Sequence, residues 1–323
     1  MNILIVGFGS IGQRHLQNLL KNYPRNSYYV LKKSNNKDVI KDCKVIANDI
    51  YTYYKNINFI THIEDIDKIN VAFICNNTSQ HIKYALELTK NGIDLFIEKP
   101  LSNDSKQLDL LNKLILEHKT ICMIGFQAKF HPVFLKLQEL IQTQRVTFVH
   151  SKWLTYLPKW HPYEDYKKRY AATKLEGGGV TLTMIHEIDI LHSLFPDLKL
   201  IHSVSGNYSS IGIEAEDYLM VNFESKNTAI SLNLSFAQIK EERAITINTN
   251  EQTIIGDFIK NTIEIYNLNN QHETIKFQIQ RNELFEKEVE HFFSIIHSRQ
   301  PELNTVSESI DIQKITDKIL ELS

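Results

Sequence analysis

The chain of 323 residues has few cysteines, and this scarcity narrows the kinds of protein it can be. Its three cysteines, Cys43, Cys75 and Cys122, are widely spaced, odd in number and form no CxxC pair. Such a pattern argues against a disulfide framework and against a cysteine zinc site, and it favours a reducing compartment. We expect three small, buried hydrophobic side chains in a cytoplasmic protein.

An excess of charge of one sign and long apolar runs are lacking as well. The 36 basic residues are balanced by 38 acidic ones, without a basic block, so nucleic acid and anionic membrane surfaces are not expected partners. The apolar start "MNILIVGFGSIG" lacks a cationic region and is interrupted by glycines. No apolar run approaches the roughly 18 residues of a membrane span. We therefore expect a ligand that is a small molecule.

The first part of the chain alternates strand and helix patterns. "NILIVGF", "SYYVLKK", "INFI", "VAFICNN", "DLFIEKP" and "TICMIGF" are short, apolar and typical of buried strands. Between them, "QRHLQNLLKN", "HIKYALELTKNG" and "SNDSKQLDLLNKLILEHK" carry apolar residues at helical spacing. The alternation predicts an α/β domain with a doubly wound parallel sheet over residues 1–122.

The rest of the chain has a different pattern. Strand-like runs such as "RVTFVHSKWLTY", "DYLMVNFES" and "TAISLNLSFA" follow one another without helices between them, which predicts a large, mostly antiparallel sheet. Helical patterns occur in "TLTMIHEIDILHSLF", "NELFEKEVEHFFSIIHS" and "SESIDIQKITDKILELS". We predict an α+β domain over residues 123–323 that includes these C-terminal helices.

Three glycines at the end of the first strand point to a nucleotide. Gly7, Gly9 and Gly12 form G-x-G-x-x-G, with a helix pattern directly after them. Small residues also occur wherever a strand and a helix pack closely, so the motif alone could mark a tight turn. Because it follows the first buried strand and opens a helix, we predict that the helix N-terminus binds the pyrophosphate of a dinucleotide.

The end of the second strand bears on which dinucleotide is bound. An acidic residue there would bind the ribose 2′-hydroxyl of NAD, and a basic one would accept the 2′-phosphate of NADP. The sequence has Lys32, Lys33 and Ser34, and no carboxylate before Asp38. We predict a preference for NADP, with NAD as the alternative. Exposed lysines on a loop are the simpler explanation of the same pattern.

A second polar group follows a strand in "FIEKPLS". Ligands bind outside the carboxyl ends of strands in an open α/β sheet, so Lys99 would face the cofactor. Pro100 restricts Lys99 to extended conformations, and Glu98 could pair with a nearby cation. An ammonium beside a substrate oxygen can donate a hydrogen bond and polarise a carbonyl, as hydride transfer requires. An ordinary exposed Lys-Pro at a strand end is the alternative.

Taken together, these segments resemble a known family. "GFGSIGQRH", "ICNNTSQH", "EKPLS" and "GGGVTLTMIHEID" occur in the order and spacing of the Gfo/Idh/MocA family, and the likeness extends to "ELFEKEVEHFFSII" near the C-terminus. The resemblance implies a Rossmann domain and an NAD(P)-dependent oxidoreductase that acts on sugars, inositols or related polyols. It also implies a homodimer or homotetramer that associates through the C-terminal sheet.

The resemblance assigns roles to individual residues. Lys99 would be the catalytic lysine, and Thr78 and His81 would flank the nicotinamide. Many members have a proline next to the position of Thr78, and this sequence differs from them because it has Asn77 there. The set that we assign to the cofactor is Gly7, Gly9, Ser10, Ile11, Gly12, Arg14, His15, Lys32, Lys33, Ser34, Asn76, Asn77, Thr78, His81, Glu98 and Lys99.

The resemblance also implies that "GGGVTLTMIHEID" brings a histidine over the nicotinamide. His186 is our acid/base candidate, because its ordinary pKa lies near neutrality and an alcohol loses a proton as its carbon loses hydride. Asp189 shares a helical face with it and is our third catalytic candidate, which could hold the imidazole in one tautomer or contact the substrate. Thr183 stands nearest to the position where many relatives have an aspartate. A buried histidine that packs on the sheet is the alternative, and because "HEIDILH" is not H-E-x-x-H, we expect no metal.

A segment rich in aromatic residues and cations precedes the glycines at 177–179. Its aromatic rings could stack on a sugar, and its cations could bind a carboxylate or phosphate. The segment is similar to one in a branch of the family that resembles the sugar-modifying enzymes of bacterial surface polysaccharides, and this resemblance implies an activated or acidic sugar. A solvated loop at a domain or subunit contact is the alternative. The residues we assign to the substrate are Lys99, Trp160, Tyr163, Arg169, Tyr170, Thr183 and His186.

We therefore predict a sugar oxidoreductase. Two other functions stay open from the sequence. One is an NAD-dependent glycosidase or lyase that oxidises its substrate only transiently, and the other is a non-catalytic NAD(P)-binding sensor. Cleavage of a glycoside without net redox change would indicate the first, and ligand binding without turnover would indicate the second.

Overall fold

The computed structural model describes residues 1–300 and 303–322, and these fold into two compact units. Unit 1 comprises Met1–Gly125, Trp160–Asp165 and Phe285–Gln313. Unit 2 comprises Phe126–Lys159, Tyr166–Leu284 and Lys314–Ser323. The chain thus passes between the units several times, and each unit has its own sheet and its own core.

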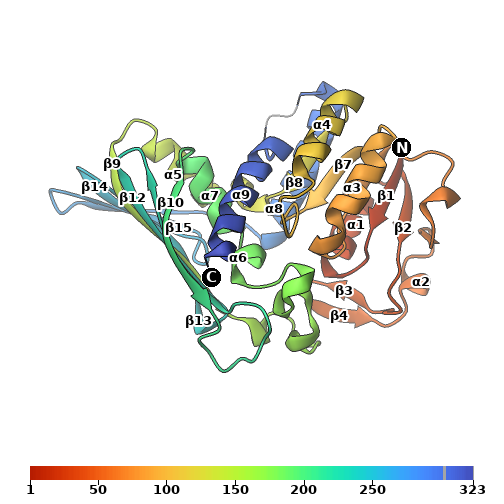
Figure 1. Cartoon of the computed structure of the whole chain (residues 1–323), viewed down its shortest axis with the longest axis horizontal. Coiled ribbons are helices and arrows are strands. Elements are labelled where there is room, and N and C mark those ends of the chain that lie inside the picture. The colour runs from red at the N-terminus through yellow and green to blue at the C-terminus, as the bar shows by residue number, and fades with distance from the viewer. Residues whose placement is uncertain (301–302, 323) are drawn as a thin grey trace. The chain divides into compact units, whose positions relative to one another are not determined.

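Unit 1 is built on a six-stranded parallel sheet (Figure 1). Its order is β5-β2-β1-β6-β7-β8, and every neighbouring pair is parallel. The continuously apolar strands are buried on both faces, which confirms the predicted doubly wound α/β sheet. The strands are β1 (Asn2–Val6), β2 (Ser27–Leu31), β5 (Asn58–Ile60), β6 (Val71–Ile74), β7 (Asp94–Glu98) and β8 (Cys122–Gly125).

The helices of unit 1 include those that the apolar spacing predicted. The predicted ones are α1 (Ser10–Asn22), α3 (His81–Lys90) and α4 (Leu108–His118), whereas the short α2 (Ile50–Tyr53) was not predicted. A small hairpin, β3 (Val39–Lys41) with β4 (Lys44–Ala47), was not predicted. The side chain of Gln13 on α1 holds this hairpin, because its amide accepts from the N–H of Ile40 and donates to the carbonyl of Asp38.

Helix α8 (Arg281–Ser298) belongs to unit 1, although we predicted every C-terminal helix to lie in the second domain. The ring of Phe292 lies 5.5 Å from the ring of Phe73 on β6 and 5.5 Å from that of Phe96 on β7. The aromatic face of α8 therefore completes the core over the parallel sheet. This packing returns the chain to unit 1 long after residue 122.

Unit 2 is built on an eight-stranded, mostly antiparallel sheet of order β10-β11-β12-β9-β13-β14-β15-β16. This confirms the predicted α+β character. Strands β12 and β9 are a parallel pair, so the sheet is not wholly antiparallel. The strands are β9 (Val146–Tyr156), β10 (Lys199–Gly206), β11 (Tyr218–Ser225), β12 (Thr228–Ser235), β13 (Ala237–Thr249), β14 (Gln252–Asp257), β15 (Thr262–Asn267) and β16 (His272–Lys276).

Helices cover one face of this sheet. Figure 1 shows α5 (Pro132–Ile141) and α7 (His186–Leu194) on the same side of it. Helix α5 was not predicted, and the single helix predicted over "TLTMIHEIDILHSLF" is divided into α6 (Val180–Thr183) and α7. Met184 leaves the helical conformation at the end of α6, which lets α7 begin afresh at His186.

The last helix, α9 (Val306–Glu321), confirms the helix predicted in the tail. It starts in unit 1 and ends in unit 2, since the division between the units falls after Gln313. In the part of the chain that the structure describes, no helix combines the length and the apolar character that crossing a membrane requires.

Candidate active site

The turn between β1 and α1 explains two of the three motif glycines. Gly7 has φ +89°, and a Cβ there would lie 2.7 Å from the backbone of Asn76 at the end of β6. A Cβ at Gly12 would lie 2.3 Å from the carbonyl oxygen of Gly7. Both positions therefore exclude any larger residue, because strand and helix approach too closely.

Gly9 is different, because a Cβ there would meet no atom within 4 Å. It is the N-cap of α1, it has no side-chain cap, and the first turn of the helix carries no acidic residue. The N–H groups of that turn, including those of Ser10 and Ile11, are therefore available to an anion. Nearby, the buried side-chain oxygen of Asn76 has no hydrogen-bond partner. The N–H groups fit the pyrophosphate of a dinucleotide, and the acceptor oxygen of Asn76 fits a hydroxyl donor such as that of a ribose.

Gly9→Val should weaken dinucleotide binding about tenfold or more, because a branched side chain would fill the open space over the helix N-terminus. The free energy of unfolding should hardly change, since nothing lies close to Gly9. Fluorescence titration with NADH and NADPH, together with thermal unfolding, measures both effects. Gly12→Ala is the opposite control, since its clash should destabilise the fold. Unchanged affinity in Gly9→Val would contradict the assignment.

The basic residues predicted at the end of β2 lie on the loop that follows it. The ammonium of Lys32 donates to the carbonyl of Ser34. Partial burial lowers the pKa of Lys32, and the charge of Lys37 lowers it further. The ammonium of Lys33 lies 5.7 Å from the ring centre of Tyr84. A hydrogen bond with Tyr84 raises the pKa of Lys33. Both lysine side chains thus lie on the loop after β2, where a basic residue would accept a 2′-phosphate.

The "EKP" segment lies where the resemblance implies, at the carboxyl end of β7. Glu98 is the last residue of the strand, Lys99 is half-buried and the Lys99–Pro100 peptide is cis. The carboxylate of Glu98 lies 2.7 Å from Nε2 of His15 on α1. Glu98 was predicted to pair with a nearby cation, and its partner in the structure is this histidine side chain.

His81 lies beside the same edge of the sheet. Its Nδ1 is 2.9 Å from the carbonyl oxygen of Pro100, and its Nε2 is 2.9 Å from that of Asn76. Burial lowers the pKa of His81, the charge of Lys99 acts in the same direction, and the two carbonyls and Glu98 oppose the shift. The ring thus lies between the ends of β6 and β7, within hydrogen-bond distance of one backbone carbonyl from each side. Thr78 lies buried in the short turn that leads into α3, and Asn77 caps that turn.

Most of the predicted cofactor residues thus gather at one edge of unit 1. Arg14 lies slightly apart, with its guanidinium 4.9 Å above the ring of Phe285 and 4.0 Å from Asp42. His15 is fully buried against the sheet. Among these residues, the backbone of the glycine turn and the side chains at the ends of β6 and β7 form the part that could hold a dinucleotide.

In unit 2, His186 begins α7 and is only 2% exposed. Its ring lies 5.8 Å from that of Phe126, edge to face. Asp189, one helical turn along, is fully buried and lies 3.0 Å from the ammonium of Lys129. Sequence reasoning missed Lys129. The signal that could have found it is a lysine inside the apolar segment "GFQAKFHP", directly after β8.

A second ion pair holds the same helix. Arg243 on β13 donates from Nε to Glu187 at 2.7 Å, and its guanidinium lies 4.3 Å from the ring centre of Trp153. Burial raises the pKa of Glu187, and Arg243 opposes that rise. Helix α7 therefore carries two buried carboxylates, both of which follow His186 in the sequence. Each is bound by a cation from a different element.

The glycines before α6 are required by close contacts. A Cβ at Gly178 would lie 2.2 Å from the carbonyl oxygen of Tyr170, and one at Gly179 would lie 2.2 Å from the carboxylate of Glu216. Glu216 accepts from the N–H of Thr181 at 3.1 Å and so caps α6. Burial raises the pKa of Glu216. Thr183, at the end of α6, is buried.

The predicted substrate residues are divided between the two units. Trp160 and Tyr163 are half-buried in the short stretch that belongs to unit 1. Arg169 and Tyr170 are half-buried in unit 2, where the hydroxyl of Tyr166 donates to the carbonyl of Ile211 at 2.8 Å. Within either unit taken alone, the full set is not brought together.

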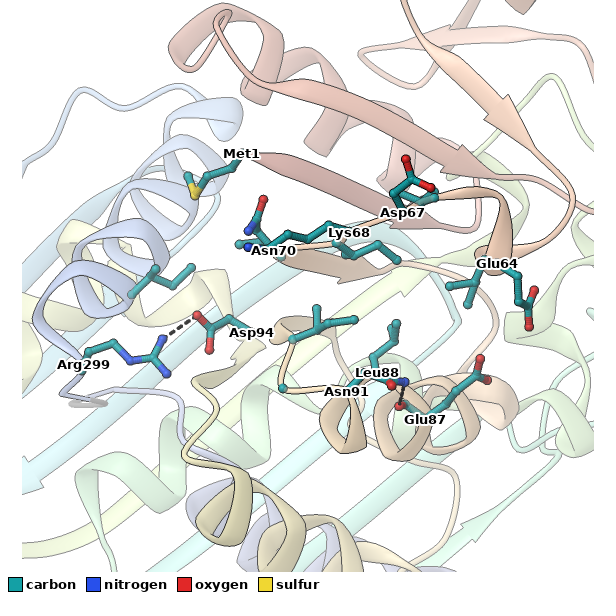
Figure 2. A pocket seen from close by; sticks show the side chains of 17 residues that line it. Met1, Glu64, Asp67, Lys68, Asn70, Glu87, Leu88, Asn91, Asp94 and Arg299 are labelled. Atoms are coloured by element: carbon teal, nitrogen blue, oxygen red, sulfur yellow. Dashed lines mark hydrogen bonds and ion pairs between the residues drawn. The ribbon is translucent and has the colours of Figure 1, made fainter.

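A large hollow in unit 1 lies at the other edge of the sheet. It measures about 700 Å³, and Figure 2 shows Arg299 pointing at Asp94, with Nη1 2.6 Å from the carboxylate. Asp94 begins β7 and Asn70 directly precedes β6, so the hollow lies at the amino ends of the strands. Nucleotides bind at the carboxyl ends in such sheets, so this hollow is not the cofactor site.

Comparison with known proteins supports this interpretation of the two units. A model described as "Oxidoreductase family, NAD-binding Rossmann fold" matches residues 1–126. Its companion, described as "Oxidoreductase family, C-terminal alpha/beta domain", matches residues 144–322. The two models together account for nearly the whole chain.

The curated proteins that match by sequence share about a quarter of their residues with this chain, over part of its length. Inositol 2-dehydrogenase of Rhizobium meliloti (strain 1021) is 27% identical over 44% of this chain and 41% of its own length. Myo-inositol 2-dehydrogenase of Thermotoga maritima is 26% identical over 59% of this chain and 53% of its own. The chain spans about half the length of the curated relatives it matches.

Solved structures show the same fold over the full chain. UDP-N-acetylglucosamine 3-dehydrogenase from Acidithiobacillus ferrooxidans has a TM-score of 0.80 at 16% identity, covering 100% of this chain and 97% of that one. A levoglucosan dehydrogenase in complex with NADH has a TM-score of 0.83 at 15% identity, covering 100% and 96%. At such identities the likeness concerns the fold.

Proposed function

Because the chain belongs to the Gfo/Idh/MocA oxidoreductase family, we propose that it moves hydride between a nicotinamide dinucleotide and a hydroxyl-bearing carbon of a sugar, polyol or sugar derivative. The observation that carries the proposal is that the open helix N-terminus at Gly9 follows β1 and the Glu98–Lys99–Pro100 segment follows β7, at the same end of one parallel sheet with β6 between the two strands. Phosphate binding and a cation for a reacting oxygen are thereby provided on one rigid element.

The residues of unit 1 would hold the cofactor in defined ways. The N–H groups at the start of α1 would bind the pyrophosphate, and the side-chain oxygen of Asn76 would accept a hydrogen bond from a hydroxyl of the adjoining ribose. A bound nicotinamide supplies the acceptor or donor of two electrons. His15 and Glu98, which are buried and bound to one another, would support this site from behind.

Two residues would handle the proton. Lys99 would donate a hydrogen bond to the substrate oxygen and stabilise the negative charge that develops on it. His186 would take the proton of the alcohol or return it, since its ordinary pKa suits both directions near neutral pH. Asp189 would hold α7 through Lys129 instead of contacting the substrate, because its carboxylate is fully buried.

A substrate panel tests the proposed function. The relatives' names suggest myo-inositol, levoglucosan and UDP-N-acetylglucosamine as starting compounds, each with NAD+ and NADP+. We propose an activated or acidic sugar as the finer assignment, because Lys167, Lys168 and Arg169 place cations in the segment before the glycines. Formation of reduced nicotinamide with any of these would support the activity. Failure of both dinucleotides to bind would refute it.

The cofactor preference can be tested separately. We propose NADP over NAD, and the double variant Lys32→Ala, Lys33→Ala should then weaken NADPH binding about tenfold more than NADH binding, since only NADPH carries the 2′-phosphate. Fluorescence titration of both cofactors measures the ratio. Lys90→Ala, an exposed lysine on α3, is the control. An equal loss for both cofactors would remove the reason to prefer NADP.

We propose self-association through the large sheet as the resemblance implies. The sheet face turned away from α7 carries exposed side chains such as Phe148 and His150 on β9. Phe148→Lys should therefore reduce the molar mass measured by light scattering, because a charge would be buried in the interface. A mass unchanged by this variant would contradict association through β9.

We also propose a cytoplasmic location, since all three cysteines are free thiols.

A further inference from the structure

A buried polar contact in unit 1 lies next to the carboxyl ends of the parallel strands, where the dinucleotide would bind. Nε2 of His15 lies 2.7 Å from the carboxylate of Glu98, and the two residues are 0% and 6% exposed. His15 belongs to α1, whose first residue directly follows Gly9, and Glu98 directly precedes Lys99. A single hydrogen bond therefore joins the helix that would bind the pyrophosphate to the strand that ends at Lys99.

The surroundings of the pair are aromatic. The His15 ring lies 4.9 Å from the ring of Phe96, 5.5 Å from that of Phe73 and 6.2 Å from that of Phe285. An apolar side chain would suit such a site, and replacing both partners of a buried hydrogen bond by apolar groups of the same shape can be nearly neutral or stabilising. The pair is therefore not needed to fill the core. It provides a directional hydrogen bond between α1 and β7, which apolar packing does not provide. We call this hydrogen bond the tie.

We propose that His15 and Glu98 are positioning residues, whose hydrogen bond couples the position of the glycine turn to the position of Lys99. This inference rests on the proposed function. If the tie holds, dinucleotide binding at α1 restrains Lys99, and the restraint on Lys99 favours dinucleotide binding by the same factor, because coupling between two sites is reciprocal. Neither side chain contacts the cofactor in this arrangement. Their effect is transmitted through α1 and β7.

Three variants separate this role from a merely structural one. His15→Phe removes the donor and keeps an aromatic ring among aromatic neighbours. Glu98→Gln keeps the shape and an acceptor oxygen but removes the charge, so it should fold even if the first variant does not. Gln17→Leu is the matched control, because Gln17 also lies on α1 and makes two side-chain hydrogen bonds, to Ile40 and Tyr54, without a link to β7.

Two readouts are required for each protein, and neither needs the substrate. The first is the Kd of NADH or NADPH, whichever the wild type binds more tightly, by fluorescence titration. The second is the rate at which acetic anhydride modifies Lys99 in the cofactor-free protein, measured by mass spectrometry against the exposed Lys90 in the same sample. Thermal unfolding confirms that each protein is folded at the temperature used.

The tie predicts about a tenfold rise in Kd for His15→Phe, a smaller rise for Glu98→Gln, and a double variant no worse than His15→Phe. Lys99 should react at a changed rate in both variants, while Gln17→Leu should match the wild type in both readouts. Folded variants with wild-type affinity and Lys99 reactivity would overturn the inference, and so would equal losses in Gln17→Leu. A wild type that binds neither dinucleotide would instead refute the proposed function.

Discussion

Lys99→Met should lower turnover about a hundred- to a thousandfold, the loss typical of removing one group that stabilises charge in a transition state. The ammonium is the cation that the proposed mechanism places beside the reacting oxygen, at the end of β7. Methionine has a similar length and no charge. The fold should be unaffected, because Lys99 is half-buried at a strand end and lies outside the core of the sheet.

The measurement is kcat/KM with the first sugar that shows turnover, alongside the Kd of the cofactor. Affinity for the cofactor should stay within a small factor of the wild-type value, so that the loss is confined to the chemical step. Lys99→Arg should rescue only part of the rate, since a planar guanidinium does not replace a compact ammonium. Lys90→Met on α3 is the control. A wild-type rate in Lys99→Met would remove Lys99 from the mechanism.

Lys129→Met should have the largest effect on stability, lowering the free energy of unfolding of unit 2 by about 3–5 kcal/mol. Lys129 is 3% exposed, Asp189 is fully buried, and the ammonium lies 3.0 Å from the carboxylate. Without the lysine, the carboxylate is left as an uncompensated charge inside the protein. Because α7 carries His186 as well, the orientation of the histidine should be disturbed.

Urea unfolding followed by circular dichroism gives the loss of stability. Lys129→Arg should retain most of it, and the double variant Lys129→Met, Asp189→Leu should recover much of it, since no charge is then left buried. Lys136→Met is the matched control in unit 2. Lys136 pairs with Glu139 at the surface of α5, and exposed pairs contribute about 0.2–1 kcal/mol. If Lys129→Met and Lys136→Met lower the free energy of unfolding by the same amount, the buried pair stabilises unit 2 no more than the exposed pair does.

The parts of the fold that were predicted well are those in which neighbouring residues decide the outcome. "NILIVGF" and the three glycines after it predict strand, turn and helix, and the structure confirms all three as β1, the Gly7 turn and α1. Short elements with mixed patterns were missed. Strand β3 has three residues. Helix α5 was missed although Pro132 begins it and Val133, Phe134 and Leu137 recur at helical spacing.

The packing of α8 on unit 1 was not anticipated, for a different reason. "NELFEKEVEHFFSII" predicts a helix with an aromatic face, and such a helix forms as α8. The pattern does not say which sheet that face will cover. Phe292 packs on Phe73 and Phe96 of unit 1, so the choice depended on the shape of a core built from distant residues.

The sequence by itself determined the chemistry available at each strand end: the glycine turn at residues 7–12, the cations after β2, and the Glu98–Lys99–Pro100 segment. These are local patterns, because backbone conformation at a turn depends chiefly on the residues in it. Only the tertiary structure decided which side chains are partners. Glu98 meets His15, 83 positions away, and Asp189 meets Lys129 on another element. A buried charge must find a partner within hydrogen-bond reach, and only the packed core determines which groups come that close.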